Sequence, residues 1–302
     1  MTRTIWLASY PKSGNTWFRF LIANLSASEP LGVNDLPRQH TIASAREPFD
    51  QIMLIDSGLL THDEVDCLRP RLYEEMARDP VIGGFDEPGQ AAEPMRFVKV
   101  HDAYVVTPQA EPLLAGRRGA DGVILLVRDP RDVAPSLAGH IGKGIDEAIV
   151  MMNDWGAALC ATPDRLDRQL RQRLLSWSGH VASWLDQRHL PVHVVRYEDL
   201  TADTAGTFAA ALAFAGHTAS AADVQRAVGF TDFARLRQQE QAQGFREAPE
   251  RSPRPFFRLG QAGAWRRALT AAQVARIEAA HAPTMHRLGY VPVSDTRLAS
   301  TA

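Results

Sequence analysis

An apolar segment that passes directly into a turn and a helix, residues 5–25, constrains the fold of this chain most strongly. Ile5–Ala8 is apolar and long enough for one buried strand, and Pro11 and Gly14 then interrupt it. From Thr16 to Leu25 the apolar residues recur at the spacing of a helix. The sequence therefore predicts a strand, a tight turn and a helix start in direct succession.

The turn has the composition of a phosphate-binding site. Backbone N–H groups at a helix start have no partner within the helix, and the positive end of the helix dipole lies beside them. Lys12 adds a full positive charge, and Gly14 lets a phosphate approach the backbone. Ser13 and Thr16 add hydroxyl donors. We therefore interpret residues 12–17 as a phosphate-binding loop.

The motif alone leaves two other interpretations open. A P-loop for ATP or GTP has the pattern Gly-x-x-x-x-Gly-Lys-[Ser/Thr], because its glycines wrap the backbone around the β-phosphate. With the lysine at Lys12, these glycines would fall at residues 6 and 11, which are Trp6 and Pro11. The loop is thus too short to wrap a triphosphate in that way. An ordinary turn with an exposed lysine is the second alternative.

The segment Ile5–Ala8 is one of four short apolar runs without alternation, which is typical of strands in a parallel sheet covered on both faces. The other three runs are Phe97–Val100, Val123–Val127 and Val192–Val195. Helical patterns separate them, so we predict one α/β domain over residues 1–302, with a central, mostly parallel sheet flanked by helices. Ligands of such folds bind at the carboxyl ends of the strands. The residues at these ends are Lys12, His101, Arg128 and Tyr197.

Composition excludes several other classes of protein. Hydrophobic residues make up 45% of the chain and charged residues 23%, and the formal net charge is −2. This balance is typical of a soluble globular protein and provides no general attraction to nucleic acid or anionic lipid. No secretion signal or membrane span is predicted, since the longest apolar segments are too short. Cys67 and Cys160 are expected to be reduced, so we expect a cytoplasmic location.

A second anion site is predicted where the third strand passes into a helix. Arg128 ends this strand, and Ser136 lies two turns into the helix that Asp129 would cap with Pro130 in its first position. A guanidinium and a hydroxyl placed in this way can hold one phosphate from two sides. A surface cluster of arginine and aspartate at a helix start is the alternative.

Lys99-Val100-His101 ends the second strand, so the side chains of Lys99 and His101 lie on the same face. A histidine titrates near neutrality and can take a proton from a hydroxyl nucleophile. The lysine beside it can stabilise charge on a leaving group. A lone histidine is more often structural, but this one lies between the two predicted phosphate sites.

In this order, four segments resemble motifs of the cytosolic-type sulfotransferases that use PAPS (3′-phosphoadenosine 5′-phosphosulfate). They are Tyr10–Trp17, Lys99–His101, Arg128 with Ser136, and Phe257–Trp265. The resemblance covers residues 7–265 and implies a P-loop-like sulfotransferase fold; we expect a bacterial member of the family. Three positions depart from the family pattern: Val100 stands for threonine, Leu259 for lysine and Ala264 for aspartate. The change at Leu259 is expected to remove one charge contact to PAPS.

The resemblance also implies roles for individual residues. His101 would be the catalytic base, and Lys12 and Lys99 would neutralise the leaving 5′-phosphate. The cofactor-binding residues would be Lys12, Ser13, Gly14, Asn15, Thr16 and Trp17 in the loop, Arg128, Ser136, Arg258 and Gly260 around the 3′-phosphate, and Tyr197 and Phe230 at the adenine. His180, within Trp177–Trp184, matches a further family pattern but is interpreted as structural.

Two regions would complete the site. Residues 26–95, with helices expected at Gln51–Leu60 and His62–Arg78, are interpreted as an insertion that lines the acceptor pocket. Residues 241–256 are predicted to be a mobile loop over the nucleotide. Two longer helices are predicted elsewhere, at Ile145–Leu159 and Leu170–Arg188.

The function expected from the sequence is transfer of a sulfuryl group from PAPS to an acceptor hydroxyl, with release of the 3′,5′-bisphosphate and without a metal. A phenol, an alcohol, a sugar or a natural product would serve as the small-molecule acceptor. No nucleic acid partner and no membrane insertion are expected, and self-association is left open. The alternatives are an ATP-dependent small-molecule kinase with a degenerate P-loop and a non-catalytic nucleotide-binding protein.

Overall fold

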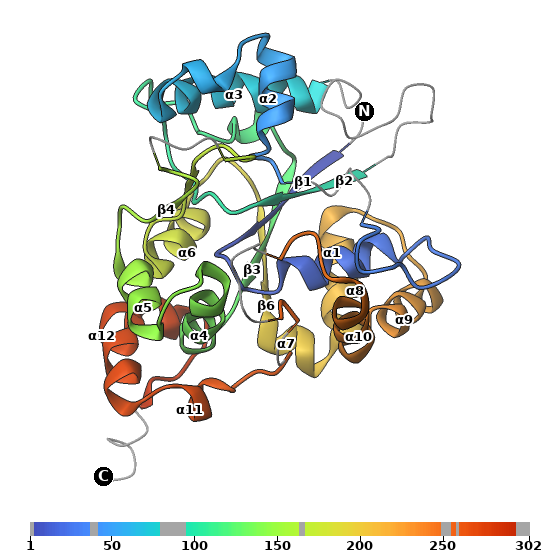
Figure 1. The fold of residues 1–302 in the computed structure, drawn as a ribbon. Coiled ribbons are helices and arrows are strands. Elements are labelled where there is room, and N and C mark those ends of the chain that lie inside the picture. The colour runs from blue at the N-terminus through green and yellow to red at the C-terminus, as the bar shows by residue number, and fades with distance from the viewer. Residues whose placement is uncertain are drawn as a thin grey trace.

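Four parallel strands form the centre of the molecule, in the order β2-β1-β3-β6 (Figure 1). Their bounds are Arg3–Ser9 for β1, Met95–Val100 for β2, Gly122–Val127 for β3 and Val192–Arg196 for β6. The computed structural model describes residues 3–36, 42–78, 95–162, 167–248, 255–257 and 260–293. The four predicted strands, and the α/β fold with a parallel sheet, are confirmed.

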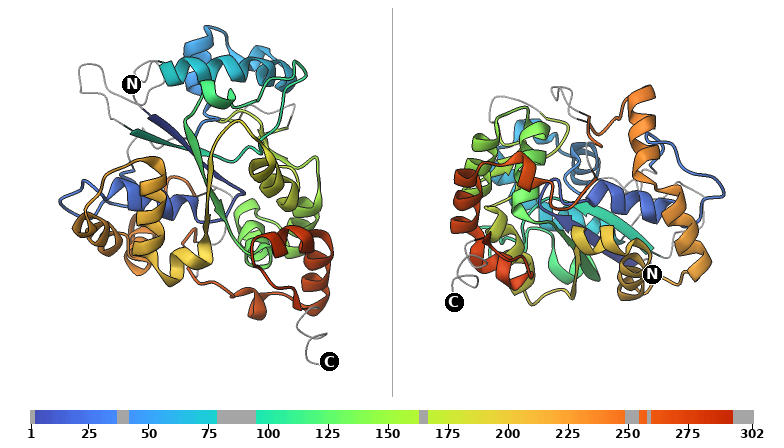
Figure 2. Two further views of the ribbon diagram at one scale, coloured as in Figure 1. Left: turned by 180° about the vertical axis from the view of Figure 1, so that it is seen from behind. Right: turned by 90° about the horizontal axis from the view of Figure 1, so that it is seen from below.

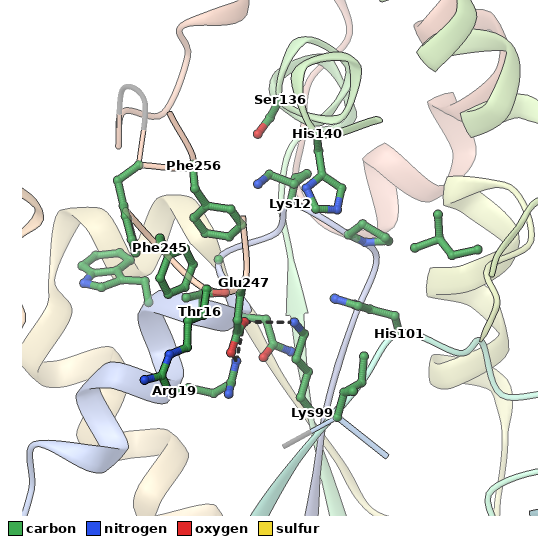
Figure 3. A pocket seen from close by; sticks show the side chains of 18 of the residues that line it. Lys12, Thr16, Arg19, Lys99, His101, Ser136, His140, Phe245, Glu247 and Phe256 are labelled. Atoms are coloured by element: carbon green, nitrogen blue, oxygen red, sulfur yellow. Dashed lines mark hydrogen bonds and ion pairs between the residues drawn. The ribbon is translucent and has the colours of Figure 1, made fainter. Parts of the chain in front are cut away.

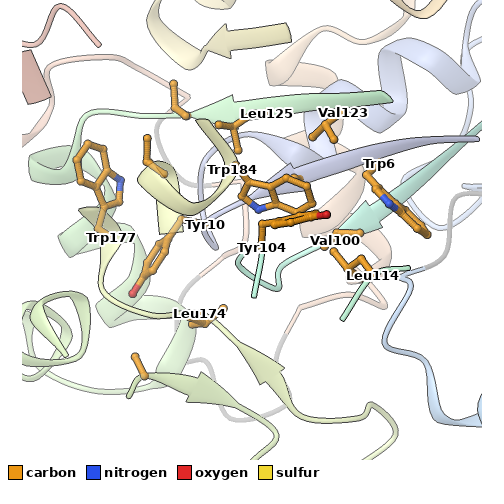
Figure 4. Close-up of a cluster of buried hydrophobic side chains, with 14 of the residues drawn as sticks. Trp6, Tyr10, Val100, Tyr104, Leu114, Val123, Leu125, Leu174, Trp177 and Trp184 are labelled. Carbon is orange, nitrogen blue, oxygen red and sulfur yellow. The ribbon is translucent and has the colours of Figure 1, made fainter. Parts of the chain in front are cut away.

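Both faces of the sheet are buried, which explains why its strands lack an alternating polar pattern. Side chains of a strand alternate between faces. Trp6 and Ala8 of β1 therefore join a core cluster with Trp177 and Trp184 (Figure 4). On the opposite face, neighbouring residues of β1 pack with side chains of α1, α8 and α9 in a second cluster. Each strand thus contributes apolar residues in both directions.

Helices cover each of these faces (Figure 2). The first face carries α4 (Pro130–Ile141), α5 (Ile145–Asn153), α6 (Trp177–Asp186) and α12 (Ala271–Arg287). The second face carries α1 (Asn15–Ala23), α8 (Thr204–Ala215) and α9 (Ala221–Phe230). The remaining helices are α2 (Arg46–Met53), α3 (His62–Arg78), α7 (Tyr197–Ala202), α10 (Phe233–Gln243), α11 (Trp265–Ala268), and the 3-10 turns η2 (Ser57–Leu59) and η3 (Gly116–Arg118). In the described parts of the chain, none of these helices has the length and apolar character needed to cross a bilayer.

Helix starts that depend on local capping agree with the sequence. The side chain of Asp129 accepts a hydrogen bond from the N–H of Arg131, and Pro130 occupies the first position of α4. Thr270 caps α12 in the same way. The predicted helix over His62–Arg78 is also confirmed, including both ends.

Three predicted helices are wrong in extent. α5 ends at Asn153, because the chain beyond it forms β4 (Ala158–Leu159), which pairs antiparallel with β5 (Gln172–Arg173). For the same reason the helix predicted from Leu170 begins only at Trp177, where Ser176 provides its cap. The third helix was predicted over Gln51–Leu60, but α2 begins earlier, at Arg46, and ends at Met53, because Leu54 adopts a left-handed backbone conformation at φ +54°.

The region predicted as a loop, 241–256, is helical at its start, since α10 extends to Gln243. Residues 249–254 of this region lie outside the described residues, so its predicted mobility stays a prediction. Residues 37–41 and 79–94 of the predicted insertion also lie outside them.

Candidate active site

A cavity of about 1080 Å³ opens at the carboxyl edge of the parallel sheet. Because the strands are parallel, the residues that follow β1, β2, β3 and β6 lie at this one edge. The four predicted strand-end residues all line the cavity: Lys12, His101, Arg128 and Tyr197. The sheet thus brings together segments that are more than 180 residues apart in the sequence.

The turn between β1 and α1 is held in a strained conformation that brings its backbone to the cavity. Lys12 has φ +73° and Gly14 has φ +97°, and α1 begins at the next residue. A Cβ atom at Gly14 would lie 2.8 Å from the ring of Tyr197, so the turn accepts no larger residue without displacing this tyrosine. The turn therefore requires glycine both for its conformation and for its packing.

Polar side chains of the turn divide between structure and site. Nδ2 of Asn15 donates to the carbonyl oxygen of Leu7 at 2.8 Å and to Oγ of Ser9 at 3.1 Å, which ties α1 to β1. Oγ of Ser13 is buried and has no hydrogen-bond partner among the described residues, but Ser13 is not among the residues that line the cavity. Thr16 lines the cavity, as do Gly14 and Asn15. Buried donors without a partner at a helix start are typical of an anion site.

Aromatic rings surround the loop. Nζ of Lys12 lies 3.7 Å from the centre of the Phe256 ring, in a cation–π contact. Trp17 lines the cavity and donates from Nε1 to the carbonyl oxygen of Thr231 at 3.2 Å. Tyr197 packs edge-on against Trp17. Aromatic side chains thus lie beside the charged turn.

His101 is anchored in one tautomer. Its Nδ1 lies 2.8 Å from the carbonyl oxygen of Ser9. A carbonyl oxygen only accepts, so Nδ1 carries the proton and Nε2 is left with a lone pair. Burial, together with the charge of Lys99, holds the pKa of His101 well below its usual range. The imidazole is therefore neutral at physiological pH and able to accept a proton.

The Lys99 side chain contacts the ion pair between Arg19 on α1 and Glu247. Glu247, in the segment after α10, accepts from Nη1 of Arg19 at 2.8 and 2.9 Å, and its Oε2 lies 3.4 Å from Nζ of Lys99. Burial lowers the pKa of Lys99, and the charge of Glu247 opposes this effect. All three side chains line the cavity, and the contacts are drawn in Figure 3.

Arg128 connects three parts of the site. It donates to the carbonyl oxygen of Lys12 at 3.4 Å and to that of Gln261 at 3.1 Å. Its guanidinium lies 4.3 Å from the centre of the Tyr197 ring. The Nε atom is buried and has no partner in the described part of the chain. Ser136, on α4, lines the same cavity.

The segment from Gly260 to Trp265 is fastened to α4 by one carboxylate. Asp132 accepts hydrogen bonds from the N–H of Gly263 at 2.6 Å and from that of Trp265 at 2.8 Å. Gly260 lines the cavity at φ +61°, packed against the ring of Phe233. Two residues of this segment lie outside the described residues: Arg258, expected at the 3′-phosphate, and Leu259, which stands in place of the family's lysine.

Arg19, His140, Phe233 and Glu247 also line the cavity, although the sequence gives none of them an individual role. Phe230, predicted to contact the adenine, is not among the lining residues; the ring from this part of the chain that lines the cavity is Phe233. His140 projects from α4 beside Lys12 (Figure 3), and burial and that lysine lower its pKa to about 3. The four-residue spacing from Ser136 to His140, one helical turn, was the available signal for His140.

The parallel sheet brings the cationic turn and the neutral histidine together in one cavity at its carboxyl edge. The chain belongs to the sulfotransferase domain family, which matches residues 2–289. It is therefore a transferase of sulfuryl groups. A search of curated protein sequences gives no match.

Solved structures show the same fold. Retinol dehydratase in complex with androsterone and the inactive cofactor PAP has a TM-score of 0.55 and 20% identity, over 94% of this chain and 82% of that chain. Mouse sulfotransferase SULT7A1 in complex with PAP has a TM-score of 0.54 and 18% identity, over 93% of this chain and 84% of that chain. At such low identity these similarities concern the fold alone.

Proposed function

We propose that the protein transfers a sulfuryl group from PAPS to the hydroxyl of a small-molecule acceptor, with His101 as the base. The observation that carries this proposal is the anchoring of His101. Its hydrogen bond to Ser9 leaves Nε2 as an acceptor in a cavity that also contains the phosphate-type turn. A base beside a phosphate site is the arrangement that group transfer to a hydroxyl needs.

The residues present fit PAPS as the donor. Ser13 and Arg128 both have buried donor atoms without a partner among the described residues, and each lies in one of the two predicted phosphate sites. We infer that the turn at residues 12–16 binds the 5′-phosphosulfate and that Arg128 and Ser136 bind the 3′-phosphate. Trp17, Tyr197 and Phe233 would enclose the adenine. PAPS would supply the activated sulfuryl group.

His101 and the two lysines then each have a defined task. His101 would remove the proton of the acceptor hydroxyl at Nε2 while Ser9 keeps its ring in place. Lys12 and Lys99 would neutralise negative charge at the 5′-phosphate, where it increases during transfer. Because the ring of His101 is held in place before the ligand arrives, little reorganisation of the base opposes the reaction.

The cavity walls combine apolar and polar side chains, which bears on the class of the acceptor. Val33, Asn34, Ile42 and Ala45, from the predicted insertion at 26–95, line the cavity together with Leu159 and Gln172. Their mixed polarity is compatible with a phenol, an alcohol, a sugar or a natural product. A cytoplasmic location and a bacterial source stay predictions from the sequence.

Calorimetry with adenosine 3′,5′-bisphosphate (PAP) and with Mg-ATP tests the proposal against a kinase. We expect PAP to bind in the presence of EDTA, and more tightly than Mg-ATP, because the turn lacks the glycines that wrap a triphosphate. Incubation with PAPS and an acceptor panel, followed by mass spectrometry, should then detect sulfated product. Equal or tighter binding of Mg-ATP, or PAP binding without transfer to any hydroxyl, would contradict it.

A further inference from the structure

Glu247 brings a negative charge into a cavity that the proposed function fills with an anionic donor. Its carboxylate bridges two cations: Arg19 on α1, at 2.8 and 2.9 Å, and Lys99 at the end of β2, at 3.4 Å. Figure 3 shows these three side chains close together, with Lys99 between Glu247 and His101. Nothing in the proposed reaction so far requires this carboxylate.

We propose that Glu247 is a positioning residue for sulfuryl transfer, which holds the Lys99 side chain at the transfer site as an ammonium group. The inference rests on the proposed function, because that function gives Lys99 the task of neutralising charge on the leaving 5′-phosphate. A neutral amine could not perform this task. The position and the protonation of Lys99 therefore both matter for turnover.

Without Glu247, the surroundings of Lys99 would disfavour its charged form. Only 15% of the Lys99 side chain is exposed, and burial lowers the pKa of a lysine. Arg19 adds repulsion. His101 and His140, the titratable groups on the remaining sides, are held neutral by burial and by nearby lysine charge. Lys12 across the cavity is a further cation, so Glu247 is the one anion of the described residues that contacts Lys99.

Glu247 itself is suited to remain an anion. Burial would raise its pKa, but the charges of Lys99 and Arg19 outweigh this effect and hold the pKa below its usual range. Its oxygens are engaged by Arg19 and Lys99, so Glu247 does not replace His101 as the group that accepts the hydroxyl proton.

The lengths of the contacts indicate which partner can move. Arg19 holds Glu247 with two short hydrogen bonds, whereas the contact to Lys99 is the longest of the three. Lys99 can therefore turn toward a phosphate while Glu247 stays on Arg19. At 3.4 Å the carboxylate of Glu247 still attracts the ammonium group of Lys99, because water screens charges less in a partly buried site than in bulk solvent.

Competitive acetylation of the ligand-free protein tests the protonation of Lys99 directly. The pH midpoint of Lys99 labelling, read by mass spectrometry against exposed Lys143, should fall by about one pH unit in Glu247→Gln, since an opposite charge at this distance is lost. Glu247→Asp keeps the charge and should restore most of the midpoint. The matched control is Glu240→Gln: Glu240 accepts hydrogen bonds from the N–H groups of Phe256 and Phe257 at 2.6 and 2.8 Å, and the rings of these residues pack against Phe245, close to Glu247. It should leave the midpoint unchanged.

The pH profile of kcat with saturating PAPS is the second readout. Activity that needs ammonium at Lys99 is lost as the pH rises through the pKa of Lys99, so the alkaline limb of Glu247→Gln should move to lower pH by the same amount. If the labelling midpoint of Lys99 is unchanged in Glu247→Gln, the inference is overturned. It is also overturned if this variant binds PAP more tightly while the alkaline limb of kcat does not move, because Glu247 would then only repel the nucleotide. A wild-type protein that transfers nothing from PAPS contradicts the proposed function instead, because the labelling result does not depend on transfer.

Discussion

Arg69 on α3 forms a two-point ion pair with the carboxylate of Asp102, the residue that follows the proposed base, His101. Nη1 and Nη2 of Arg69 lie 3.1 and 2.6 Å from the two oxygens of Asp102, and both side chains are fully buried. The N–H of Arg173 also donates to this carboxylate, and Nε1 of Trp184 donates to the carbonyl oxygen of Asp102. The backbone that carries His101 is thus held by three other segments of the chain.

We expect Arg69→Met to destabilise the protein by about 3–5 kcal/mol, because it leaves the charge of Asp102 buried without its partner. Urea unfolding measures this loss. In the protein that still folds, turnover should fall more than PAP affinity, since the change loosens the segment of His101 and not the phosphate-type turn. An exposed ion pair contributes roughly 1 kcal/mol or less. If the unfolding free energy of Arg69→Met lies within about that amount of wild type, the buried pair of Arg69 and Asp102 contributes little to stability.

His101→Ala should reduce turnover by roughly 10²–10⁴, the usual contribution of a positioned general base, and leave PAP affinity nearly unchanged. An activated phenol is already partly ionised, so it should lose less rate than an alkyl alcohol. Steady-state kinetics on both acceptors, with calorimetry of PAP binding, measure these effects. Full turnover of the variant on the alcohol would exclude His101 as the base.

The same residue determines a pH dependence. Burial and Lys99 depress the pKa of His101, so the base stays unprotonated as the pH falls through the ordinary histidine range near 6.5. The acid limb of kcat/KM should therefore lie below that range. A limb at about pH 6.5 that disappears in His101→Ala would show that the imidazole is more exposed than the structure indicates.

Arg128→Ala should weaken PAP binding by about 1.5–3 kcal/mol, because a charge-assisted contact to the 3′-phosphate is lost. Adenosine 5′-monophosphate lacks this phosphate and should bind the variant and the parent alike. Arg128→Lys keeps a charge but not the planar guanidinium over Tyr197, and should show an intermediate loss for PAP. Equal losses for both nucleotides would place Arg128 away from the 3′-phosphate.

His180 should make the protein acid-labile. It is fully buried in the core, donates from Nδ1 to the carbonyl oxygen of Leu174, and has a pKa lowered by burial to about 4. The unfolded chain protonates this histidine near pH 6.5, so stability is present above that pH and is lost as the pH falls toward 4. The loss is about 3 kcal/mol from His180 alone. Urea titrations between pH 7.5 and 4 should show a shallower decline for His180→Asn, which retains a donor; an equally steep decline would assign the lability to other groups.

The fold could be predicted because its signals are local. Each strand is a continuous apolar run, and the starts of α4 and α12 depend on one capping side chain and its neighbours in the sequence. The antiparallel pair β4–β5 was not predicted, since its two-residue strands are stabilised by each other and not by their own composition. Both helices adjacent to it were predicted too long for this reason.

The residues of the candidate site also differ in whether a local sequence signal predicts them. Lys12, His101 and Arg128 were predicted because each follows a recognisable strand, and the edge of a parallel sheet brings such residues together. Arg19 and Phe233 were missed, because nothing near them in the sequence distinguishes a residue that faces the cavity from one that faces solvent. Glu247 lies within the segment predicted over the nucleotide, 241–256, but its individual role was not predicted.

The sequence by itself determined the strands, the phosphate-type turn and the chemistry available at the strand ends, since these follow from backbone sterics, capping and residue type within a few positions. Only the tertiary structure decided the tautomer of His101, the buried partner of Asp102 and the charge that faces Lys99. Ser9, Arg69 and Glu247 are 92, 33 and 148 residues from these partners. A pairing over such a separation depends on how the whole chain packs, and the resulting burial sets which groups are charged.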